Sequence, residues 1–177
     1  MGKKEEILTL ANRELQEKGV SSLSFRELAA RLDIKSSSVH YYFPAKDDLI
    51  EEVARNYAAA TFASLQERTA KLKPGKARLE ELLALIEEKL EGRQCTAGIL
   101  AAESAQISTA ARKIVSSFFG AMGDWIRTEL KAMGKSEKEA KTLSFVLLSA
   151  VEGCLMIDSL GKKNLHLKEL REFTAGL

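Results

Sequence analysis

The chain has few of the residues that interrupt helices or cross-link small folds. Its 177 residues include two prolines, two cysteines, two histidines and one tryptophan. Runs of β-branched residues, which favour strands, are missing, whereas Ala, Leu, Glu and Lys are abundant. Because 45% of the residues are hydrophobic, the chain can bury a sizeable core. The composition therefore predicts an all-α protein and excludes the disordered and fibrous classes.

The sequence also lacks motifs for catalysis and metal binding. It has no HExxH, no Cys/His cluster with zinc spacing, no P-loop, no GxGxxG after a strand and no Gly-x-Ser-x-Gly elbow. Cys95 and Cys154 stand far apart without a CxxC motif, which is typical of reduced thiols; a disulfide or a thiol sensor is the alternative. We expect no enzymatic activity, no cofactor and no metal site.

Neither secretion nor membrane insertion is indicated. Met1 leads directly into the charged residues 3–6, without the apolar segment of a signal peptide. The most apolar stretch, residues 143–157, is shorter than a membrane span and carries Glu152. We expect a cytoplasmic protein with no membrane partner. Its net charge is only +2, so bulk charge does not indicate nucleic-acid binding.

The most specific pattern lies between residues 24 and 46. Four apolar residues spaced as on one face of a short helix are Phe25, Leu28, Ala29 and Leu32. Ser24 and Glu27 have the spacing of a capping box at the start of this helix. A connection of three residues leads to a second short segment, residues 36–43, in which Val39 and Phe43 face inward. This layout is typical of a helix-turn-helix, whose second helix enters the major groove of DNA.

The outer face of the second helix is polar and aromatic. Small hydroxyl side chains let a helix approach base edges, while Tyr and Lys side chains reach phosphates. A compact helical bundle with a polar turn is the alternative interpretation. The predicted DNA contacts are Ser24, Arg26, Ser36, Ser37, Ser38, His40, Tyr41, Tyr42 and Lys46.

Residues 25–29, Ile34 and residues 38–49 together resemble the DNA-binding domain of the TetR/AcrR (tetracycline-repressor) family of bacterial regulators. Three positions depart from the family pattern: Asp33, Lys35 and His40 stand where Gly, a capping Ser or Thr, and Tyr are usual. Asp tolerates the left-handed backbone conformation better than most residues, so the turn can still form. The resemblance implies an all-α fold, with an N-terminal three-helix helix-turn-helix domain at residues 1–47. A C-terminal helical domain for ligand binding and dimerisation would then occupy residues 48–177.

Further helices are predicted from apolar periodicity and stop signals on both sides of this motif. Pro44 and Pro74 fall between them, and Ser136 with Glu139 has the capping-box spacing. The expected helices span residues 3–18, 46–71, 77–91, 95–105, 109–133, 136–160 and 165–173.

Residues 136–160 carry apolar side chains on nearly every face, so both sides of this helix need cover. We expect the core on one side and a partner subunit on the other; a central helix in a monomer is the alternative. The resemblance implies a twofold dimer through a four-helix bundle, for which residues 109–133 and 136–160 are the candidates.

A cavity between the long helices is the predicted effector site, with plain core packing as the alternative. Glu103 and Glu152 are candidate polar anchors, because an acid among apolar residues must be solvated, paired or used on a ligand. The predicted lining residues are Phe62, Cys95, Ile99, Glu103, Phe118, Met122, Trp125, Phe145 and Ser149.

These observations predict a one-component transcriptional regulator. We expect a repressor that binds a palindromic double-stranded DNA operator as a homodimer and is released by a small-molecule effector. Two alternatives are a helical-bundle small-molecule-binding protein without operator binding and a regulator controlled by a protein partner. The identity of the effector, the operator sequence and the choice between repression and activation do not follow from the sequence.

Overall fold

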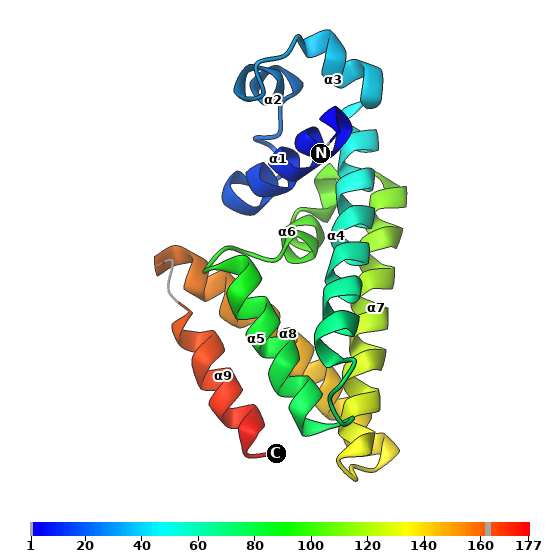
Figure 1. The fold of residues 1–177 in the computed structure, drawn as a ribbon, viewed down its shortest axis with the longest axis vertical. Coiled ribbons are helices and arrows are strands. Elements are labelled where there is room, and N and C mark those ends of the chain that lie inside the picture. Colours follow the sequence, from blue (N-terminus) through cyan, green and yellow to red (C-terminus); the bar gives the residue numbers. More distant parts are fainter. Residues whose placement is uncertain (1, 162–163) are drawn as a thin grey trace. The chain divides into compact units, whose positions relative to one another are not determined.

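The computed structural model describes residues 2–161 and 164–177, and within them the chain forms helices and no strands (Figure 1). The all-α prediction is confirmed, and the helices begin and end within a few residues of the expected positions. Their bounds are α1 Lys3–Lys18, α2 Phe25–Arg31, α3 Ser36–Tyr42, α4 Lys46–Thr69, α5 Lys76–Leu90, α6 Thr96–Ala102, the 3-10 helix η1 Ser104–Gln106, α7 Thr109–Ala132, α8 Glu137–Gly161 and α9 Leu165–Ala175.

The chain divides into two compact units. The first comprises Met1–Ala59 and Thr96–Ser117, and the second comprises Ala60–Cys95 and Phe118–Leu177. Helices α4 and α7 therefore contribute residues to both units. This structural division differs from a single cut after residue 47, and the predicted functional boundary there stays a prediction.

The core of the first unit supports the two short helices α2 and α3. Most apolar residues of α1 are buried, as are Val39 and Phe43 on the inner side of α3. The first turns of α4 complete this core with Leu49, Ile50 and Val53. At about 25 cal/mol per Å² of apolar surface, each such side chain contributes about 1.5–3 kcal/mol through burial. This buried core therefore holds α3 in place while its outer face stays exposed.

Two turns in this unit use the left-handed region of backbone space. Gly19, directly after α1, has a φ of 80°, which glycine adopts without steric cost. Asp33, between α2 and α3, has a φ of 51°. The expectation that Asp33 can replace glycine in this turn is thus confirmed.

The two predicted capping boxes have different outcomes. Ser24 is the N-cap of α2, but its side chain makes no capping hydrogen bond, so the capping-box prediction is wrong there. At Ser136 the prediction is confirmed: the Ser136 N–H donates to the Glu139 carboxylate at 2.9 Å, and the Glu139 N–H donates to Ser136 Oγ at 3.3 Å. The same four-residue spacing therefore forms reciprocal bonds only at the second site.

In the second unit, buried carboxylates hold helix starts in place. Glu129 of α7 is buried and accepts a hydrogen bond from the Gly75 N–H, directly before α5, at 2.6 Å. Asp158 of α8 accepts from the N–H groups of His166 and Leu167 in the first turn of α9, each at 3.0 Å. The bonds from His166 and Leu167 outweigh the effect of burial and lower the pKa of the Asp158 carboxyl. Charged acceptors suit helix N-termini because the unpaired N–H groups there point toward them.

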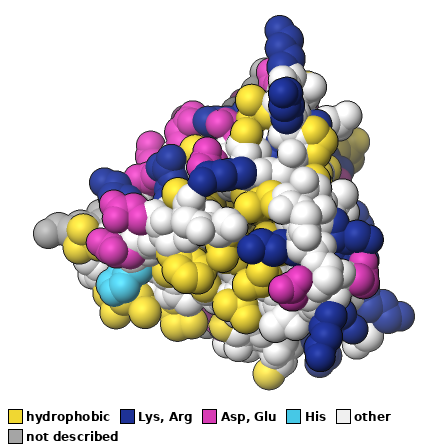
Figure 2. All heavy atoms as spheres, turned by 90° about the horizontal axis from the view of Figure 1, so that it is seen from below, with side chains coloured by type: hydrophobic (Ala, Val, Ile, Leu, Met, Phe, Trp, Pro, Cys, Tyr) yellow, Lys and Arg dark blue, Asp and Glu magenta, His cyan; other side chains and the backbone are white. Residues whose placement is uncertain are grey.

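Helix α8 has one buried side and one uncovered apolar side. Its buried residues include Leu147, Val151 and Leu155. Among the described residues, α8 is long and apolar enough to cross a membrane by length and composition, although only 28% of its apolar window is buried. The large hydrophobic residues exposed on α8 are Phe145, Val146, Met156, Ile157 and Leu160. Hydrophobic side chains also gather between charged ones on the face drawn in Figure 2.

Candidate nucleic-acid interface

Helix α3 separates an apolar inner side from a polar outer side within two turns. Val39 is fully buried on the inner side, and Phe43 is buried directly after the helix. On the outer side Ser37, His40 and Tyr41 are exposed, and 81% of the Tyr41 surface is open to solvent. A large aromatic residue this exposed contributes little to the core. Its position is typical of a residue that contacts a partner.

Ring contacts arrange the aromatic side chains at this face. The His40 ring lies edge-on to Phe25 of α2, with centroids 4.8 Å apart, so α2 sets the direction of the imidazole. The Tyr41 and Tyr42 rings meet in the same T-shaped manner at 5.1 Å. Such pairs contribute about 0.5–1.5 kcal/mol beyond the area that they bury. The two phenol groups are thus held relative to each other on the short helix.

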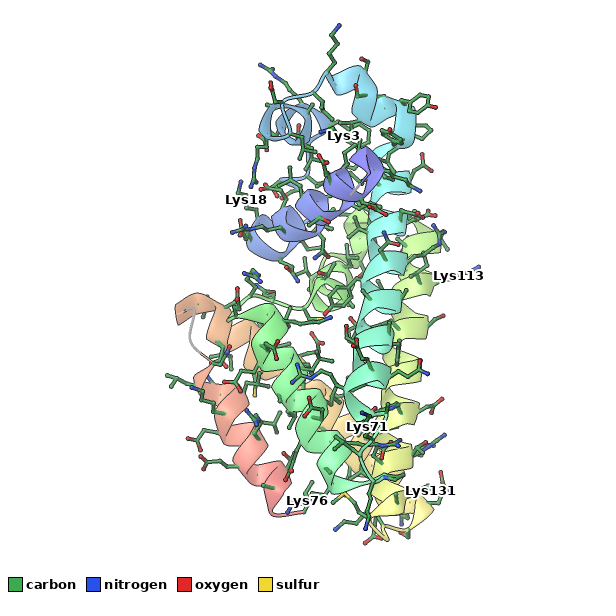
Figure 3. All side chains as sticks on the ribbon, viewed as in Figure 1. Lys3, Lys18, Lys71, Lys76, Lys113 and Lys131 are labelled. Atoms are coloured by element: carbon green, nitrogen blue, oxygen red, sulfur yellow. The ribbon has the colours of Figure 1, made fainter. Side chains whose placement is uncertain are left out.

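A groove of about 430 Å³ runs beside this face. Ser37, Ser38, Tyr41 and Tyr42 line it from α3, and Lys3 lines it from the first turn of α1. Figure 3 labels Lys3 at this end of α1 and Lys18 at the opposite end. The Lys3 ammonium group pairs with Glu6 at 2.8 Å, an exposed ion pair that leaves the lysine further donors. Sequence reasoning did not include Lys3, because its proximity to α3 follows only from the packing of α1.

The remaining predicted DNA contacts have different surroundings. Arg26 is exposed on α2, whereas Ser24, Ser36 and Ser38 are half-buried. Lys46, at the first position of α4, donates a hydrogen bond from its ammonium group to the backbone C=O of Val20 at 2.6 Å. The structure therefore brings α3 and Lys3 together around one groove. The Lys46 side chain instead binds the backbone of the turn after α1.

The residues predicted to line an effector cavity fall in both units, and a common cavity stays a prediction. Ile99 and Glu103 belong to the first unit, and the other seven belong to the second. Phe62 and Phe118 are in ring contact, with centroids 5.8 Å apart, whereas Phe145 and Ser149 lie on the uncovered side of α8. The Glu103 carboxylate accepts hydrogen bonds from the Val20 N–H at 3.0 Å and the Gln106 side chain at 3.1 Å.

Glu152 is the predicted anchor whose carboxyl has a strongly raised pKa. It lies half-buried on α8, and desolvation raises the pKa of its carboxyl to about 7, while a hydrogen bond from the Cys95 side chain acts in the opposite direction. Cys95 is buried, and both cysteines are free thiols. Burial, reinforced by the charge of Asp158, raises the pKa of the Cys154 thiol. In the part of the chain that the structure describes, no group of three acidic, His or Cys side chains could hold a metal ion.

Taken together, α1–α3 form a helix-turn-helix domain in an all-α protein, with the polar face of the second short helix uncovered. This arrangement is that of a DNA-binding regulator. Residues 7–53 match the family model described as bacterial regulatory proteins, tetR family. Residues 76–172, more than half of the chain, match the model described as transcriptional regulator LmrA/YxaF-like, C-terminal domain. The chain belongs to the tetR family of bacterial regulatory proteins.

Individual relatives agree with this assignment. The HTH-type transcriptional repressor KstR2 of Rhodococcus jostii (strain RHA1) is 24% identical over 98 residues, which are 55% of this chain and 48% of that repressor. The chain thus aligns with about half the length of this curated relative. A TetR transcriptional regulator from Legionella pneumophila has the same fold, with a TM-score of 0.93 and 24% identity over 99% of this chain and 97% of the other. A TetR-family regulator from Agrobacterium tumefaciens has a TM-score of 0.90 and 18% identity over 98% and 96%.

Proposed function

We propose that this protein is a cytoplasmic one-component transcriptional repressor that binds a palindromic DNA operator as a homodimer. The observation that carries the proposal is the uncovered polar and aromatic face of α3 above the buried Val39 and Phe43. Membership of the tetR family supports it, because the residues of this face lie inside the matched N-terminal model.

The DNA contacts divide by chemistry. Ser37, Ser38, His40 and Tyr41 would meet base edges or thymine methyl groups in the major groove. Tyr42 and Lys3 line the same groove and would hold phosphates, which fix the register of the protein on the duplex. Other contacts from the predicted set, at the edge of the interface, are Ser24, Arg26 and Ser36.

The dimer would form through the uncovered apolar side of α8. Five large hydrophobic residues on this helix are exposed, Leu160 to 88% of its surface, and a second copy of the chain would remove them from water. A twofold axis at this face gives each dimer two recognition helices. Successive major grooves on one side of DNA are about 34 Å apart, so this separation sets the half-site spacing.

A small-molecule effector in the C-terminal half would release the operator. Glu152, with its raised pKa, supports a polar anchor there because its carboxyl can donate a hydrogen bond when protonated and accept one when ionised. A hundredfold loss of operator affinity needs a coupling of only about 2.7 kcal/mol between the two sites. One small ligand can supply that difference.

Selection of bound duplexes from a random DNA library tests the proposal. The purified protein at near-physiological salt should enrich an inverted repeat with half-sites about one helical turn apart. The protein should be tested with and without cell extract, and its folding checked by circular dichroism. Absence of enrichment from folded protein in both conditions would reject operator binding. The helical-bundle binding protein would then be the better description.

A further inference from the structure

Two charged side chains meet on the backbone of one residue in the turn after α1. Glu103, directly before η1, accepts the Val20 N–H at 3.0 Å, and Lys46, at the start of α4, donates to the Val20 C=O at 2.6 Å. Val20 itself is buried. Hydrogen bonds to charged groups are about twice as strong as neutral ones, and these two join three segments that are distant in sequence.

The turn is shaped to receive the Glu103 carboxylate. Gly19 has a φ of 80°, and a Cβ placed on it would overlap Glu103 Oε1, so glycine serves both the backbone conformation and the close approach. The Gln106 side chain donates to the same carboxylate at 3.1 Å. One carboxylate oxygen of Glu103 therefore accepts hydrogen bonds from both Val20 and Gln106.

Two further bonds fix the segment that carries Glu103. Thr96, at the start of α6, donates from its hydroxyl to Asn12 of α1 at 2.8 Å. Ser108, just before α7, donates to Glu51 of α4 at 2.8 Å. The segment from residue 96 to 108 is thus tied to α1, to the following turn and to α4, while its N-terminal neighbour, Cys95, belongs to the second unit.

We propose that Glu103 and Lys46 act as positioning residues, whose clamp on Val20 orients α1–α3 so that a dimer can bind both operator half-sites. This inference rests on the proposed operator binding. It gives both residues a different role from the one expected from sequence, a ligand anchor for Glu103 and a phosphate contact for Lys46. Loss of the clamp should change the spacing of the two recognition helices in a dimer. The contacts that each helix makes with its own half-site should stay unchanged.

The experiment compares Glu103→Ala, Glu103→Gln and Lys46→Ala with wild type, with Glu172→Gln on the exposed side of α9 as the matched control. Affinity is measured for the selected inverted repeat and for a duplex holding a single half-site, across a salt series. Glu103→Ala and Lys46→Ala should each weaken binding to the full repeat by about tenfold and leave half-site binding unchanged. Glu103→Gln keeps an oxygen acceptor at the same length and should retain most of the affinity.

The salt series separates a clamp from a phosphate contact. A lost phosphate contact lowers the slope of log K against log salt by about one, whereas a lost clamp leaves the slope unchanged. Equal losses for the full repeat and the half-site, or a reduced slope for Lys46→Ala, would overturn the positioning role.

Exchange of the Val20 amide hydrogen, followed by NMR, reads the clamp without DNA. Glu103→Ala should accelerate this exchange by about tenfold or more, with little change in the helical signal of the protein. Unchanged exchange would also overturn the inference. If wild type selects no operator but Val20 exchange responds as expected, operator binding fails while the clamp itself stands.

Gly19→Ala supplies a second test within the folded protein. In the wild-type background, Gly19→Ala introduces both backbone strain and an overlap with the Glu103 carboxylate. In a Glu103→Ala background the overlap is gone, and only the backbone strain remains. The loss of full-repeat affinity caused by Gly19→Ala should therefore be smaller in the Glu103→Ala background than in wild type. Equal losses in both backgrounds would count against contact between the turn and Glu103 in solution.

Discussion

Two helices of this protein each leave one face uncovered, and the chemistry of the two faces differs. The outer side of α3 carries hydroxyl groups, an imidazole and two phenols, whereas the outer side of α8 carries Phe145, Val146 and Met156 among its exposed residues. Both helices also have a buried side. A polar face at the tip of a helix-turn-helix suits DNA, and an apolar face suits a second copy of the chain. The comparison shows that exposure alone does not identify a partner; the side chains at the exposed positions do.

The largest expected effect comes from placing charge on the α8 face. Met156→Lys should prevent dimerisation, because an ammonium group would be buried against an apolar partner surface. Operator affinity should fall by at least about a hundredfold, since each monomer then binds a single half-site. Sedimentation velocity and fluorescence anisotropy with the selected operator measure the two effects. Lys141→Gln, an exposed change on the same helix, is the control; a Met156→Lys protein that stays dimeric would contradict the assignment of this face.

The half-buried Glu152 of α8 predicts a pH dependence of stability. Because its pKa is raised to about 7, the folded protein holds a proton that the unfolded chain releases near pH 4.5. Stability from this group is present at low pH and is lost as pH rises toward 7. Between pH 5 and pH 8 the free energy of unfolding should fall by about 2.5 kcal/mol more in wild type than in Glu152→Gln. Urea unfolding at both pH values gives the difference; equal falls in the two proteins would mean that Glu152 ionises normally.

A smaller effect is expected on the α3 face. Tyr41→Ala should weaken operator binding by about tenfold and relax the preference at one base pair, because a base-edge contact is the role proposed for Tyr41. Its high exposure means that stability should change little. Lys3→Ala is the comparison: it should weaken binding equally across sequences and lower the salt slope by about one. A second round of library selection with each variant distinguishes the two patterns.

The smallest expected effect is on stability, from the N-cap residues of α8 and α2. Ser136→Ala should cost about 1 kcal/mol of stability, because it removes the capping bond at the start of α8. Ser24→Ala should change stability by only a few tenths of a kcal/mol, since its side chain makes no capping bond. Chemical denaturation of the two variants side by side is the measurement. Equal losses would show that Ser24 caps α2 in solution.

Local signals were enough to predict the helices. Pro44 and Pro74 lie between consecutive helices, Gly19 directly follows α1, and Gly134 lies two residues after the end of α7. Apolar spacing identified the buried apolar residues of α1 and α3. These signals work because they act within one turn of helix. The Ser24 prediction was wrong because the spacing of a capping box permits its hydrogen bonds without ensuring their geometry, as Ser136 and Ser24 together show.

The partners of single polar groups could not be predicted in the same way. Lys46 and Glu103 are 57 positions apart in the sequence, and no local pattern indicates that both bind the backbone of Val20. Lys3 likewise joins the α3 groove only because α1 packs with its first turn beside that helix. Such pairings depend on long-range packing, which periodicity does not encode.

The sequence by itself determined that this protein is helical and, to within a few residues, where its helices begin and end, because both follow from interactions between residues close in the chain. Resemblance to a known family, added to that spacing, indicated that residues 24–46 form a helix-turn-helix. The tertiary structure alone decided which carboxylates are buried, which side of α8 stays uncovered, and that the turn at Val20 is held from both sides. Those properties depend on which distant segments come into contact, and burial, desolvation and hydrogen-bond partners arise only from that contact.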